Sequence, residues 1–126
     1  MLTKIELLKI FRNKLIDFLD ALREKLPKEK DIVVLRVYLA EQIPIETVLQ
    51  IFAKRILPYE DMVNTQDERF FIEQNDLFEG LKRDKVHYFR ELWTSPTFTK
   101  EDKDSLWGWF KVFLKLAKMY TTSYSS

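Results

Sequence analysis

The chain is poor in the residues on which several classes of protein depend. Among its 126 residues there is no cysteine, and there are only one histidine, two glycines and four prolines. Without cysteine the chain can form no disulfides, thiolate zinc sites or cysteine nucleophiles. Sheets joined by tight turns usually need glycine at positions of positive φ, so the scarcity of glycine favours helices.

Long apolar runs are missing as well. The longest span four residues, such as residues 32–35, so we expect no segment to cross a bilayer. Lys4 and Glu6 interrupt the first apolar stretch, and no small-residue cleavage site follows it, which argues against a signal peptide. We therefore expect a protein of the cytosol or nucleus that is not secreted.

The sequence also lacks the patterns of catalytic and metal-binding sites. It has no glycine-rich phosphate loop, since Gly80 and Gly108 are its two glycines. His87 has no second histidine or cysteine with which to bind zinc, and no nucleophile beside it. Asp17 and Asp20 lie one turn apart and are interpreted as a surface pair rather than an acid–base pair. We expect no catalytic residue, metal site, cofactor or small-molecule substrate, and hence no enzyme.

Helical periodicity is the main pattern that is present. Thr3 and Glu6 have the spacing of a capping box, and leucine and phenylalanine then recur every three or four residues. This pattern predicts a helix over residues 4–26, which Pro27 ends.

The stretch KDIVVLRVYLAEQIP, residues 30–44, allows two interpretations. Its valines favour a strand, but its apolar residues do not alternate with polar ones. The three- and four-residue spacing favours a helix after Asp31, with the apolar positions Ile32, Leu35, Leu39 and Ile43. Pro44 then suits the first turn of a third helix, predicted over residues 45–57 and ended or kinked by Pro58.

Residues 59–79 differ in composition from the rest. They contain seven acids and one base, a net charge of −6, and are interpreted as a solvated connection with one short helical turn at residues 67–71. Two further helices are predicted, over residues 76–93 and from Thr99 to about residue 120. Residues 121–126 form a polar tail that is expected to fray.

Together these elements predict an all-α fold. We expect a single-domain bundle of about five helices in residues 1–120, with a long acidic connection between the third and fourth helices, followed by the tail of residues 121–126. The predicted core consists of Leu8, Phe11, Leu15, Phe18, Leu22, Leu35, Leu39, Ile51, Phe52, Phe89, Phe110 and Phe113.

Aromatic residues are abundant, at 14% of the chain. On a helix, Trp107 and Trp109 point about 200° apart. Either the last helix is covered on most sides, or Trp107 and Leu114 face a partner. Tyr120 and Tyr124 are expected to hold the tail against this chain or a neighbour. We therefore predict a partner-binding surface formed by Trp107, Leu114, Tyr120 and Tyr124.

An alternative function rests on charge. Lys111, Lys115 and Lys118 lie at i, i+4 and i+7, and no acidic residue follows Asp104. A basic stripe is suited to contact with phosphates, although three lysines form a small footprint. The alternative function is therefore a nucleic-acid-binding accessory protein that uses these three lysines.

Four segments carry a resemblance to a known group: FRNKLIDFLDALREKLPKEKDI, VLQIF, LPYEDMVNTQDERFF and WGWFKVFLKLAKMY. They are similar to small helical proteins encoded by large DNA viruses of algae and protists. The matching elements are Asp17-Phe18-Leu19-Asp20, Pro27, Lys30-Asp31, Pro58-Tyr59, Asp67 and Phe70-Phe71, whereas HYFRELW departs from the pattern. The resemblance implies no assigned catalytic residues and a role in the virion or in infection, in the host cytoplasm or the particle. With the residue pattern, it predicts a non-catalytic structural or adaptor protein that acts through protein–protein contacts, as a minor virion component.

Overall fold

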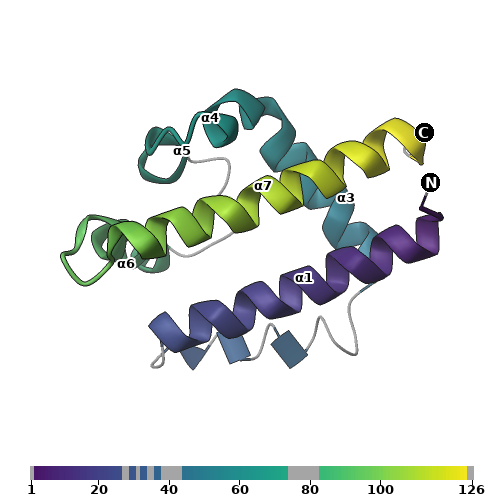
Figure 1. Cartoon of the computed structure of the whole chain (residues 1–126). Coiled ribbons are helices and arrows are strands. Elements are labelled where there is room, and N and C mark those ends of the chain that lie inside the picture. The colour runs from purple at the N-terminus through teal and green to yellow at the C-terminus, as the bar shows by residue number, and fades with distance from the viewer. Residues whose placement is uncertain are drawn as a thin grey trace. The chain divides into compact units, whose positions relative to one another are not determined.

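The computed structural model describes residues 2–26, 29–30, 32–33, 36–37, 44–73 and 83–124, with the backbone alone at residues 84, 85, 88 and 89. The fold is all-α, as predicted (Figure 1). No strand occurs among the described residues. The elements are α1 (Lys4–Lys25), α3 (Ile45–Ile56), the 3-10 turn η1 (Leu57–Tyr59), α4 (Glu60–Asn64), α5 (Arg69–Ile72), α6 (Arg83–Thr94) and α7 (Lys100–Ser123).

Capping boxes begin the two longest helices, as the sequence predicts. At α1, Glu6 N donates to Thr3 Oγ1 at 3.1 Å, and Thr3 N donates to Glu6 Oε1 at 3.2 Å. These bonds lower the pKa of Glu6, because they favour its charged form. At α7, Asp102 N donates to Thr99 Oγ1 at 3.2 Å, and Thr99 N donates to Asp102 Oδ2 at 2.9 Å.

Parts of three predictions fall outside the described residues. In the predicted second helix, residues 32–33 and 36–37 are helical, as is residue 30 just before it, and the other positions of that helix lie outside the description. The predicted core residues Leu35 and Leu39 are among these, and the side chain of Phe89 is also outside it. Of the predicted helix over residues 76–93, the described part is α6, which begins at Arg83.

The helices are divided into two compact units. The first unit comprises Met1–Ala53 and Leu116–Ser126, and the second comprises Lys54–Lys115. Two helices, α3 and α7, continue from one unit into the other. The predicted division into a bundle of residues 1–120 and a tail of residues 121–126 stays a prediction.

In the first unit, α1, α3 and the last part of α7 are joined by polar and aromatic contacts. Lys4 Nζ lies 2.8 Å from Glu46 Oε2, and Gln50 Nε2 donates to the hydroxyl of Tyr120 at 3.0 Å. The ring centroids of Phe11 and Phe52 lie 6.1 Å apart. Among the described residues of this unit, the buried apolar side chains are Leu7, Phe11, Leu19, Leu26, Ile45, Leu49, Ala53, Leu116, Ala117 and Tyr120.

The predicted core of this unit is partly wrong. Ile51 is 47% exposed, because α3 buries the line formed by Ile45, Leu49 and Ala53, and Ile51 points about 200° from Leu49. Phe11 is buried as predicted. The other predicted members on α1 and α3 are half-buried at the margins of the packed faces, and they are Leu8, Leu15, Phe18, Leu22 and Phe52.

The second unit is built around aromatic side chains. Phe71 lies at the centre, with its ring centroid 5.0 Å from that of Phe70, 4.8 Å from Trp93 and 4.8 Å from Trp107. Phe110 lies 5.1 Å from Phe71 and 6.1 Å from Phe113, so the two predicted core residues on α7 are buried in this group. Rings that meet edge to face or offset in this way gain stability beyond the area that they bury.

Gly108 lies in the middle of α7 on its exposed side. A Cβ atom added there would meet no heavy atom within 4 Å, so the surroundings do not require glycine. We expect Gly108→Ala to raise the free energy of unfolding by about 0.5–1 kcal/mol, because glycine in a helix interior loses more backbone entropy on folding than alanine does. Urea denaturation at low protein concentration measures this change. A loss of stability would contradict it.

Candidate interaction surfaces

The structure places Trp107 and Leu114 inside the chain. Trp107 is 3% exposed and packs against Phe70, Phe71 and Trp93, and Leu114 is 4% exposed. The prediction that these two residues face a partner is therefore wrong. The sequence allowed either a last helix that is covered on most sides or one with a side that faces a partner. The structure shows the first, because Phe70 and Phe71 cover the side of α7 on which Trp107 lies.

Tyr120 and Tyr124 hold the end of α7 within the same chain. Tyr120 is 2% exposed, and its hydroxyl accepts from Gln50. Tyr124 is half-buried, its hydroxyl donates to the carbonyl of Leu2, and its ring centroid lies 6.4 Å from that of Tyr120. These contacts offset the entropy cost of ordering residues 121–124. The helix therefore continues to Ser123, where fraying was predicted, and Tyr120 offers no area to a partner.

The three lysines of the basic stripe differ in their surroundings. Lys111 is half-buried, and its Nζ donates to Gln66 Oε1 at 3.0 Å. Lys115 and Lys118 are exposed. Lys111 is thus engaged with a side chain of its own unit, and nucleic-acid binding by the stripe stays a prediction.

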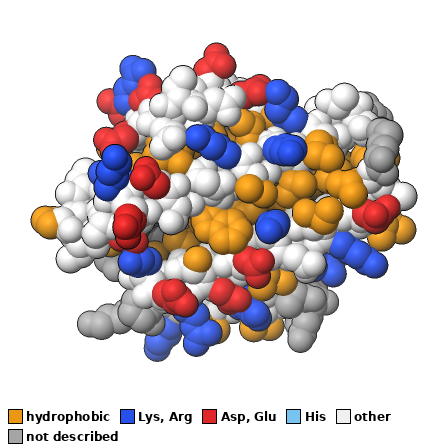
Figure 2. Space-filling view, viewed as in Figure 1, with side chains coloured by type: hydrophobic (Ala, Val, Ile, Leu, Met, Phe, Trp, Pro, Cys, Tyr) orange, Lys and Arg blue, Asp and Glu red, His pale blue; other side chains and the backbone are white. Residues whose placement is uncertain are grey.

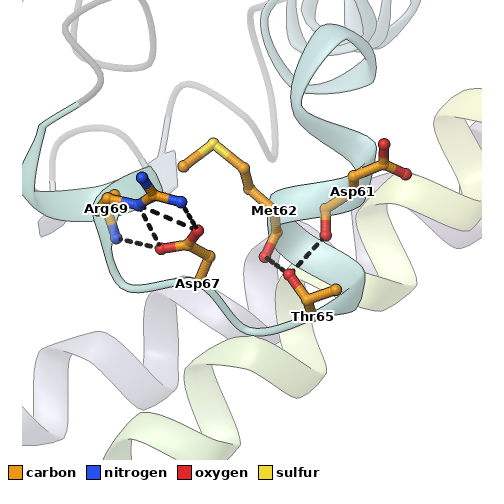
Figure 3. A network of polar contacts seen from close by, with 5 residues as sticks. All are labelled: Asp61, Met62, Thr65, Asp67 and Arg69. Atoms are coloured by element: carbon orange, nitrogen blue, oxygen red, sulfur yellow. Dashed lines mark hydrogen bonds and ion pairs between the residues drawn. The ribbon is translucent and has the colours of Figure 1, made fainter.

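The acidic segment is more structured than the sequence indicated, because α4 and α5 lie within it. Figure 3 shows how the segment turns between them. Helix α4 ends with Gln66 in the left-handed region at φ 54°. Gln66 N donates to the carbonyl of Val63 at 3.2 Å, and Asp67 N donates to that of Met62 at 2.8 Å. This pair of bonds is a Schellman motif, in which glycine is the usual residue at the position of Gln66.

Asp67 and Arg69 fix the start of α5 (Figure 3). Asp67 Oδ1 accepts from Arg69 N at 3.1 Å, and Asp67 Oδ2 lies 2.6 Å from Arg69 Nη2. These hydrogen bonds lower the pKa of Asp67 and raise that of Arg69, because each favours the charged form. The carboxylate most central to this turn is therefore bound to a guanidinium, which makes it a poor cation ligand.

A second acid of this segment is also engaged. Glu68 Oε1 lies 3.2 Å from Lys103 Nζ, and that ammonium lies 5.1 Å from the ring centroid of Trp93. Lys103 thereby joins α7 to both the acidic segment and α6. On α6, His87 Nε2 lies 2.8 Å from Glu91 Oε1, and both side chains are exposed. These pairs are typical of solvated helix surfaces.

Among the described residues, the large apolar side chains that reach the surface lie outside the predicted partner-binding surface. They are Ile5, Val33, Val37, Ile51 and Val112. The first four belong to the first unit and Val112 to the second. Figure 2 shows hydrophobic side chains that reach one face of the molecule among acidic and basic ones. Nothing in the sequence of α3 set Ile51 apart from Leu49, since both are apolar and only packing decides which of them is exposed.

Among the described residues, no three histidine, cysteine or acidic side chains are grouped so that they could hold a metal ion. Within that part, no helix has the length and apolar character needed to cross a membrane. Compared with known proteins, the chain matches no family model, no curated protein and no solved structure.

Proposed function

We propose that this is a non-catalytic structural or adaptor protein that acts through protein–protein contacts of its first unit. The observation that carries the proposal is the exposure of aliphatic side chains there. Ile5 is 66% exposed, and Val37 and Ile51 are each 47% exposed. Val33 and Val37 are one helical turn apart, so they lie side by side on one face. Exposed apolar side chains that lie side by side are typical of protein interaction sites.

The elements that present these side chains are held in place. Arg36 Nε donates to Asp20 Oδ1 at 2.6 Å, which ties the segment with Val33 and Val37 to α1. The ion pair between Lys4 and Glu46 joins the starts of α1 and α3, and Lys4 is the residue before Ile5 on α1. A partner would therefore meet a preorganised surface, which reduces the entropy cost of binding.

The test compares substitutions on the proposed surface with a matched one elsewhere. Asn64 is exposed and belongs to the second unit, so a lysine there adds the same charge away from this surface. We expect Ile51→Lys and Ile5→Lys to remove a bound protein that wild type and Asn64→Lys retain, in quantitative mass spectrometry of cross-linked complexes. Circular dichroism must show equal helicity for all variants. Retention of the same proteins by every variant would contradict the proposal.

The resemblance to proteins of large DNA viruses extends this proposal to a minor component of virus particles. In that case the partner is another virion protein. Mass spectrometry of purified particles tests the extension separately, because a cellular adaptor would be absent from particles and would still lose its partner on Ile51→Lys.

A further inference from the structure

The exposed face of α7 has a regular order of side chains. Asp104, Gly108, Val112 and Lys115 are all exposed and lie at i, i+4, i+8 and i+11, which places them on one side of the helix. Gly108 is at the middle of this side, with open space beside it. We call these four residues the α7 face. All four belong to the second unit.

The two charges of the α7 face have no counterpart within the described part of the chain. Neither Asp104 nor Lys115 forms a hydrogen bond or ion pair with a described residue. The helix dipole does not account for their order, since its effect is confined to the first and last turns, and these residues lie further inside α7. The residues one turn on either side of Lys115 are Lys111 and Met119, so it also lacks an acidic neighbour on its own helix.

The order of these residues is complementary to itself. Consider a second α7 that lies antiparallel across the first, with a two-fold axis between positions 109 and 110. Residues 104 and 115 are then equally far from the axis, about 8 Å along the helix at a rise of about 1.5 Å per residue. Asp104 of each copy then faces Lys115 of the other. Val112 of each copy meets Gly108 of the other near the axis, where the missing side chain lets the two helices approach closely.

We propose that the α7 face is a self-association surface, through which two copies of this chain pair antiparallel. A second copy is the occupant that fits, because a two-fold interface requires one patch to be complementary to itself. A single pair of crossing helices buries little area, so the dimer is weak and depends on concentration. This surface shares no residue with the exposed aliphatic side chains of the proposed function, and either can fail without the other.

Charge reversal tests the pairing. Sedimentation velocity of the full chain over a wide concentration range should show a monomer–dimer equilibrium that weakens as salt rises, since the charges are exposed. Asp104→Lys and Lys115→Glu, each alone, place like charges opposite one another and should weaken self-association about tenfold or more. An equimolar mixture of the two variants should associate again, because each then faces the opposite charge.

A substitution at the axis gives an independent test. Gly108→Leu should weaken the dimer while raising the melting temperature of the monomer, because leucine favours the helix but keeps the two helices apart. A wild type that stays monomeric at all concentrations, or variants that associate as strongly as wild type, would overturn the proposal. The proposal would also be overturned if the wild-type monomer bound a DNA duplex and Lys115→Glu abolished this binding. That result would assign Lys115 to the basic stripe.

Discussion

Phe71→Ala is expected to lower the free energy of unfolding of the second unit by about 3–5 kcal/mol, the usual range for a buried phenylalanine. Phe71 is almost wholly buried, and its ring contacts those of Phe70, Trp93, Trp107 and Phe110. Alanine leaves a cavity whose aromatic lining loses these contacts. Because domains are stable by only about 5–15 kcal/mol, this change removes a large part of the total.

Urea denaturation followed by tryptophan fluorescence measures this effect, since Trp93 and Trp107 adjoin the cavity. Val112→Ala, in the same unit, is the matched control, because an exposed aliphatic side chain should change stability by no more than about 0.5 kcal/mol. Phe71→Leu should fall between the two. A loss below about 1 kcal/mol for Phe71→Ala would show that the aromatic group is not the core of the second unit.

The same residue explains why the sequence analysis was wrong about Trp107. The periodicity of α7 showed apolar residues on more than one side, and it left open whether the chain or a partner covers the second side. The net charge of −6 in residues 59–79 predicts a solvated connection there. In the structure, Phe70 and Phe71 of that stretch supply the cover. Because a solvated connection offers no cover for α7, the sequence predicted that Trp107 faces a partner.

Other elements were predictable to different degrees for local reasons. Capping boxes and long apolar stripes define α1 and the start of α7 in the sequence, and both were predicted within a residue or two. Helix α4 was missed because Gln66 stands where glycine would have marked a helix end. On α3, Leu49 and Ile51 are both apolar and point in nearly opposite directions, so only tertiary packing decides which of them is buried.

The second large effect is expected at Phe11, in the first unit. Phe11 is fully buried on α1 and lies against Phe52 of α3. Phe11→Ala should lower the free energy of unfolding of that unit by about 3–5 kcal/mol. The mutation also tests whether the two compact units unfold separately, because the three tryptophans of the chain all lie between Lys54 and Lys115.

Tryptophan fluorescence therefore reports on the second unit, whereas far-UV circular dichroism reports on all helices and includes the long α1. We expect Phe11→Ala to shift the circular dichroism midpoint more than the fluorescence midpoint, since compact units commonly open as separate cooperative elements. Phe71→Ala should produce the opposite order, with fluorescence shifting more. If both variants move both signals together, the continuity of α3 and α7 makes the chain one cooperative unit, and the separation predicted here is wrong.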